Sequence, residues 1–134
     1  MKKNALILAA TLAMAGLAGP ALEAKPRLTG EERLAKLLEG RVAGQPVRCI
    51  NTFNTRDTTI IDKTAIVYHA GNVIYVNRPR FPNSLDDDRI MVTEIRGGQL
   101  CKLDTVRMVE RTGGFFAGFV GLEDFVPYRR IAAK

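Results

Sequence analysis

The sequence predicts a mainly β (α+β) domain, built as a small antiparallel sheet or partly closed barrel of about six or seven strands with one N-terminal helix. Residues 58–77 are dominated by β-branched and aromatic side chains and are interrupted twice by small turn residues, which is typical of strands joined by tight turns. Residues 28–40 instead space their leucines at helical intervals. The chain has 134 residues, 46% of them aliphatic or aromatic, which is enough for one domain with a packed core.

The first 24 residues have the pattern of a cleavable export signal. Two lysines precede an uncharged Ala/Leu-rich run, residues 5–18, and small residues with a proline follow it. As a helix this run would be about 21 Å long, shorter than the ~30 Å hydrocarbon core of a membrane, so a cleaved signal is favoured over an anchor. Cleavage fits after Ala21 or after Ala24. We therefore expect a periplasmic or secreted single domain, residues 25–134, with no membrane span after signal cleavage.

Cys49 and Cys101 are the only cysteines, and in an exported protein an even cysteine count favours a disulfide. This bridge would close a loop of about 53 residues and stabilise the domain by about 4 kcal/mol on the chain-entropy model. A redox-active pair is disfavoured because the spacing is not Cys-x-x-Cys.

Residues 28–40 predict an amphipathic helix of about ten residues. Thr29 is a good N-cap, Glu32 three residues later completes a capping box, and Gly40 is placed to end the helix. The leucines share one face: Leu34, Leu37 and Leu38. Since so short a helix is marginal alone, this face must dock on the sheet.

The remaining apolar segments predict strands that are separated by Gly, Pro, Asn and Asp turns. The expected strands are residues 47–53, 58–61, 64–69, 73–77, 90–96, 100–103 and 105–111, and residues 115–126 form a last hairpin or a bulged strand. Two registers are open for the hairpin around Gly71: one pairs Val67 with Ile74, and the other pairs Tyr68 with Tyr75.

Few residues have the chemistry of an active site. His69 is the only histidine and Ser84 the only serine, and no nucleophile motif surrounds Ser84. The aspartates at 86–88 lack the alternating spacing of a calcium loop, and no metal-ligand spacing links His69 to the cysteines. We therefore expect no catalytic residue, no metal and no cofactor, and a protein that is not an enzyme. The alternative is a periplasmic hydrolase that uses His69 with a carboxylate.

Basic residues exceed acidic ones, with a formal net charge of +6. Arg78 and Arg80 flank a proline and are candidate contacts for an anionic component of the cell envelope, since guanidinium groups bind carboxylate and phosphate. Nucleic acid is not expected as a partner, because Phe53, Tyr68 and Tyr75 are expected in the core rather than interleaved with exposed basic residues.

A glycine-rich segment, residues 113–121, carries Phe115, Phe116 and Phe119. These phenylalanines either fill the core or form an exposed contact surface for another protein. In the strand expected at residues 105–111, Val109 lies on the face whose other residues are polar. The sequence thus favours a small exported binding or interaction module of unknown ligand, and the remaining alternative is a structural or assembly protein of the envelope.

Several segments together also resemble a known family. They are residues 32–41, 60–62, 65–68, 75–79, 84–88, 99–101 and 125–128. In these the chain resembles a family of short exported bacterial proteins defined only as a domain of unknown function, and the resemblance spans nearly all of the expected mature chain. It implies export and paired cysteines, and it implies no activity.

Overall fold

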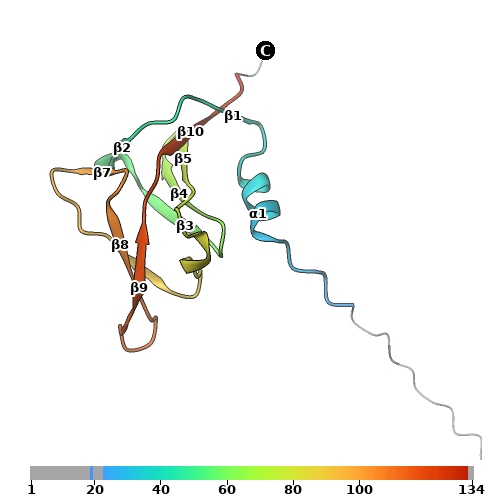
Figure 1. The fold of residues 1–134 in the computed structure, drawn as a ribbon. Helices are drawn as coiled ribbons and strands as arrows, with labels where there is room; N and C mark the ends of the chain where they lie inside the picture. The colour runs from blue at the N-terminus through green and yellow to red at the C-terminus, as the bar shows by residue number, and fades with distance from the viewer. Residues whose placement is uncertain (1–18, 20–22, 133–134) are drawn as a thin grey trace, which may run out of the picture.

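The computed structural model describes residue 19 and residues 23–132 (Figure 1). The predicted signal peptide lies outside the described residues, apart from Gly19, Glu23 and Ala24. Within the described part of the chain, no helix has the length and the hydrophobicity that crossing a membrane requires.

The prediction of a mainly β domain with one helix is confirmed. The described residues form one α-helix and ten strands in three antiparallel sheets that do not close into a barrel. The helix α1 spans Gly30–Leu37. The five-stranded sheet has the order β1 (Arg41–Ala43), β10 (Phe125–Arg130), β5 (Val73–Asn77), β4 (Ala65–Ala70) and β3 (Asp57–Ile61). The three-stranded sheet has the order β6 (Ile90–Val92), β8 (Thr105–Val109) and β9 (Phe116–Gly121), and the two-stranded sheet pairs β2 (Cys49–Asn51) with β7 (Gln99–Cys101). Two short 3-10 helices are η1 (Thr52–Asn54) and η2 (Pro82–Ser84).

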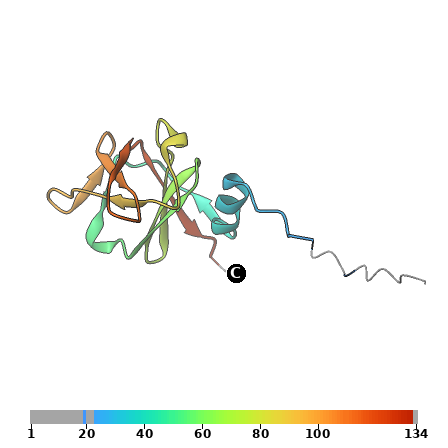
Figure 2. The same cartoon turned by 90° about the horizontal axis from the view of Figure 1, so that it is seen from below.

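The five-stranded sheet lies between the helix and the two smaller sheets (Figures 1 and 2). Its strands are apolar on both sides because both sides are covered. On the helix side, Leu34 of α1 packs with Ile61 and Val67. On the other side, Ile66 and Phe125 pack with Val106 and further apolar residues of the smaller sheets. The domain therefore has two hydrophobic cores, one on each face of its central sheet.

The helix begins where the sequence predicts. The side chain of Thr29 accepts a hydrogen bond from the backbone N–H of Glu32, and the Glu32 carboxylate accepts one from the backbone N–H of Thr29. This reciprocal pair is the predicted capping box. Leu34 is buried, and Leu37 and Leu38 pack beside it on the same core, so the leucine face docks on the sheet as expected.

The hairpin of β4 and β5 resolves the open register: Tyr68 pairs with Tyr75. The strand count exceeds the expected six or seven because several strands are only three residues long. The strand expected at residues 90–96, for example, is only the three-residue β6 in the structure. Residues 127–130 also belong to a strand, β10, where Pro127 lies next to the short strand β1. The proline lacks an N–H, but its carbonyl still accepts a bond from Gly44.

The predicted disulfide between Cys49 and Cys101 is present. The two residues are directly opposite each other in the β2–β7 pair, with Cα atoms 4.0 Å apart. The next pair of this small sheet, Ile50 and Leu100, is buried in the larger core. The bridge therefore holds a sheet of two short strands against the rest of the domain.

Candidate functional site

Arg78 and Arg80, the two arginines that the sequence suggests as anion contacts, are each already paired with a carboxylate. The Arg78 guanidinium donates two hydrogen bonds to Glu31 of α1, at 2.6 and 2.9 Å. The Arg80 Nε donates to the Glu123 carboxylate at 3.0 Å. Hydrogen bonding to Arg78 lowers the pKa of Glu31, and the same contact raises the pKa of Arg78. An anion would have to displace these carboxylates, and the prediction that Arg78 and Arg80 bind one stays a prediction.

The only histidine lies on a sheet surface. His69 is half-buried in β4, opposite Asp57 of β3, and its Nε2 is 3.2 Å from the hydroxyl oxygen of Thr59. Among the described residues no carboxylate is hydrogen-bonded to the imidazole. The described residues therefore show no hydrogen-bonded pair of an acid with His69, and the hydrolase alternative stays a prediction.

Three carboxylates gather where the β3–β4 turn meets the loop before β6. One oxygen from each of Asp62, Asp86 and Asp87 lies within 4.8 Å of the others. Arg33 of α1 neutralises Asp87 at 2.7 Å, and Arg89 lies 3.5 Å from Asp86. These ion pairs fasten the aspartate-rich loop to the helix and to the start of β6, so we assign the cluster a structural role.

The most unusual surface is the outer side of the three-stranded sheet. In β8, Val106 and Met108 point into the core, so Arg107 and Val109 point outward. Register places Val109 between Ile90 and Phe116, and Arg107 between Val92 and Phe119. We call this surface the outer sheet face and define it by six residues: Ile90, Val92, Arg107, Val109, Phe116 and Phe119.

A β-bulge brings two phenylalanines of β9 to the same side. The register shifts between Met108 and Val109, opposite Gly118, which has a φ of 126° that side chains rarely adopt. The rings of Phe116 and Phe119 consequently lie 4.8 Å apart and contact each other. They remain 59% and 62% exposed, so the pair packs against itself in solvent rather than in the core.

A shallow apolar hollow continues this surface past Phe119. It has a volume of about 320 Å³, and Phe81, Leu103 and Leu122 line it together with Phe119. Phe81 is 70% and Leu103 64% exposed. Arg80 and its partner Glu123 stand at the rim. The arginine and the phenylalanine that the sequence suggested as separate contacts thus border the same hollow.

The sequence-predicted aromatic positions divide between core and surface. Phe115, in the loop between β8 and β9 that projects from one end of the molecule, is 72% exposed (Figure 1). Tyr68 is buried as expected, and burial raises its pKa. The expectation that Phe53 lies in the core is wrong: it sits on η1 and is 84% exposed.

Sequence reasoning named the phenylalanines of the outer sheet face but missed Ile90 and Val92. The one signal in the sequence for an apolar surface here was Val109, which lies on the otherwise polar face of its strand. No protein-family model, curated protein or solved structure matches the chain.

Proposed function

We propose that this chain is an exported, disulfide-stabilised binding module without catalytic activity, and that it docks another protein through the outer sheet face. The observation that carries the proposal is the pair Phe116 and Phe119, which contact each other yet remain more than half exposed on a sheet whose other side already packs the core.

Leaving this surface in water is costly. Complete burial of a phenylalanine is worth about 1.5–3 kcal/mol, so covering these two half-exposed rings would contribute on the order of 2–3 kcal/mol to an association. Ile90, itself 43% exposed, lies on the same face of the sheet, and Val109 lies between it and Phe116. Exposed apolar groups that adjoin in this way mark interaction surfaces more often than single exposed residues do.

Arg107 gives the surface a polar centre. It lies between Val92 and Phe119 in the register, and no carboxylate of the described residues lies within ion-pair distance of it. Aromatic residues and arginine are enriched in protein interfaces, where arginine meets a partner's carboxylate in fork geometry. This composition supports a protein partner that presents apolar groups around an acidic residue.

Export and the lack of catalysis are further parts of the proposal. The signal pattern of residues 1–24 and the disulfide both support an oxidising compartment. The imidazole of His69 is hydrogen-bonded to Thr59 rather than to an acid, which supports a binding role over a hydrolase.

The test is site-specific photo-crosslinking in cells that export the protein. A photoreactive phenylalanine analogue at position 119 should form a covalent adduct with a protein. The matched control places the same analogue at Phe53, which is more exposed but lies on η1, outside the three-stranded sheet. We expect an adduct from position 119 that is absent from position 53 and is lost when Phe116→Ser is added.

Two outcomes would contradict this function: no adduct from position 119, or equal adducts from both positions. The mass of the adduct identifies the partner class directly, since a second copy of the chain doubles it. Phe116→Ser should leave the thermal midpoint almost unchanged, because substitutions of exposed residues usually change stability by within about 0.5 kcal/mol.

A further inference from the structure

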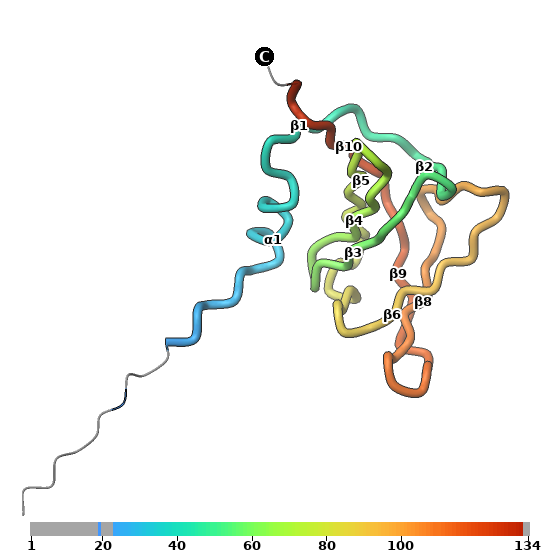
Figure 3. Tube along the Cα trace, turned by 180° about the vertical axis from the view of Figure 1, so that it is seen from behind, coloured from blue at the N-terminus to red at the C-terminus, as the bar shows by residue number. Residues whose placement is uncertain are grey.

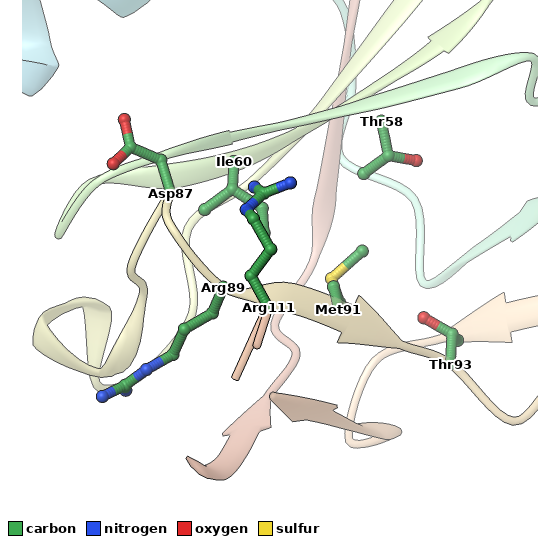
Figure 4. A pocket seen from close by; sticks show the side chains of 7 residues that line it. All are labelled: Thr58, Ile60, Asp87, Arg89, Met91, Thr93 and Arg111. Atoms are coloured by element: carbon green, nitrogen blue, oxygen red, sulfur yellow. The ribbon is translucent and has the colours of Figure 1, made fainter. Parts of the chain in front are cut away.

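A second site lies between two sheet edges that do not pair with each other, those of β3 and β6 (Figure 3). β3 ends the five-stranded sheet and β6 ends the three-stranded sheet. A groove of about 420 Å³ opens between them, lined by Thr58 and Ile60 of β3 and by Met91 of β6. Figure 4 shows these side chains together with Arg89, Thr93, Asp87 and Arg111, which complete the lining.

We propose that this groove binds an extended acidic peptide segment of another protein, which adds as a strand to the free edge of β3. This site is separate from the outer sheet face, and the proposal does not depend on that face binding a partner.

The edge of β3 is unprotected. Natural proteins blunt sheet edges with short strands, bulges, prolines or lysines, because an edge presents unpaired N–H and C=O groups to any passing chain. Among the described strands, the other edge strands are three residues long or, in β9, bulged. β3 instead pairs with β4 over five consecutive residues, with neither a lysine nor a proline among them. It therefore offers about 17 Å of regular free edge, enough for about five residues of an added strand.

The floor of the groove is apolar. Ile60 and Met91 are half-buried and pack on the larger core from opposite sides of the groove. A strand added to β3 would point alternate side chains onto this floor and the intervening ones to solvent. Thr58 and Thr93 flank the floor with hydroxyl groups. The expected ligand therefore alternates apolar and polar residues, as strand-addition ligands do.

The charges select an acidic ligand. Asp87 is neutralised by Arg33 at 2.7 Å, and Arg89 lies 3.2 Å from Glu110. Arg111 is different: its Nε donates to the backbone carbonyl of Asp88 at 3.1 Å, and no carboxylate of the described residues lies within ion-pair distance. In Figure 4 the Arg111 side chain extends toward Ile60, whereas that of Arg89 points away. A carboxylate on the added strand would give the Arg111 guanidinium the ionic partner that it lacks among the described residues.

The test selects ligands from a random peptide library displayed on phage, using the oxidised full-length protein. We expect enriched peptides that alternate apolar residues and carry Asp or Glu. Binding of one synthesised winner should slow hydrogen–deuterium exchange of the β3 amides, because strand addition pairs groups that face water in the free protein. Enrichment without alternation, or binding that leaves β3 exchange unchanged, would overturn the proposal, and so would a library that yields no enriched peptide.

Matched variants locate the site. Thr58→Glu puts a negative charge into the groove and should weaken the acidic peptide about tenfold or more, since like charges that face each other across an interface are strongly unfavourable. Thr59→Glu makes the same change on the adjacent residue, whose side chain faces the other side of the sheet, and should leave the affinity within about twofold. Equal effects of the two glutamates would refute strand addition in the groove.

Arg111→Glu provides a second variant that does not touch a strand, because Arg111 is exposed in the loop after β8. When the library is selected for binding to this variant, the enriched peptides should be basic rather than acidic. An acidic preference that persists would refute the charge argument. A Phe116→Ser/Phe119→Ser double variant should bind the peptide like the wild type, which separates failure of this site from failure of the outer sheet face.

Discussion

Removing the disulfide should cost this domain a large share of its stability. The bridge joins residues that are 52 apart in the sequence. Cross-linking over that separation removes denatured-state entropy worth about 4 kcal/mol, an upper value that native geometry usually reduces. Small domains have only about 5–15 kcal/mol in total. We therefore expect a Cys49→Ser/Cys101→Ser variant to lose about 3 kcal/mol.

The structure makes this variant a clean test of the cross-link. Cys49 is exposed and Cys101 half-buried, so serine hydroxyls in their places leave neither a core cavity nor a deeply buried unpaired polar group. Ile50 and Leu100, the next pair along, stay in the larger core. Any loss therefore reports the constraint on the chain rather than damaged packing.

Urea unfolding followed by circular dichroism measures the effect. The oxidised wild type should unfold at clearly higher urea than the double variant, with a thermal midpoint on the order of 10–20 °C higher. Reductant should lower the wild-type midpoint to that of the variant and leave the variant unchanged. Equal midpoints for oxidised wild type and variant would refute the view that the bridge stabilises this fold.

Three further substitutions probe the packing that positions the two sites. Asn77→Ala should cost about 2 kcal/mol or more in urea unfolding, because the buried Asn77 amide bonds both the N–H and the carbonyl of Glu123 and its loss leaves them unsatisfied; a smaller loss would show that water replaces the amide. Leu34→Ala should cost about 2–4 kcal/mol, since Leu34 is the buried contact of α1, and a loss below ~1 kcal/mol would mean that the helix is not docked. Arg78→Ala should cost less than about 1 kcal/mol at neutral pH, because both partners of its ion pair are largely exposed. Because the pKa of Glu31 is lowered in the folded protein, the ion pair stabilises the fold above the carboxyl pKa of the unfolded chain, and this stabilisation is lost as the pH falls below about 4. The wild type and the variant should therefore have the same stability at low pH. A difference that persists there would contradict this assignment.

Local signals were sufficient to predict the helix and the central hairpin. The capping box of Thr29 and Glu32 lies within one turn of chain, and the hairpin turn at Gly71 joins strands that are adjacent in sequence. Only the choice of register required the structure, because apolar residues occupy both faces of both strands. The disulfide could also be predicted, since only two cysteines are available.

Long-range pairing explains what the sequence did not predict. The short strand β1 exists because β10, almost 90 residues later in the chain, pairs with it. Pro127 reads locally as the end of a strand, yet it is tolerated inside β10 because β1 stops beside it. Such three-residue strands have no periodicity long enough to detect.

The candidate sites could be predicted only in part, because they too depend on pairing between distant segments of the chain. The phenylalanines of the outer sheet face are conspicuous in the sequence, but their exposure depends on a bulge opposite Met108. The partners of Arg78 and Arg80 are 47 and 43 residues away in the sequence. The groove between β3 and β6 depends on which strands remain unpaired, and no local pattern encodes that.

The most direct measurement is the affinity of the protein cross-linked from position 119 for purified wild type and for two single variants. We predict that Phe119→Ser weakens binding by about 2 kcal/mol, roughly thirtyfold, as loss of a central aromatic contact does. Phe53→Ser, on the more exposed phenylalanine, should leave the affinity within about twofold of wild type. Equal affinities for the three proteins would contradict the claim that the outer sheet face is the binding surface of this domain.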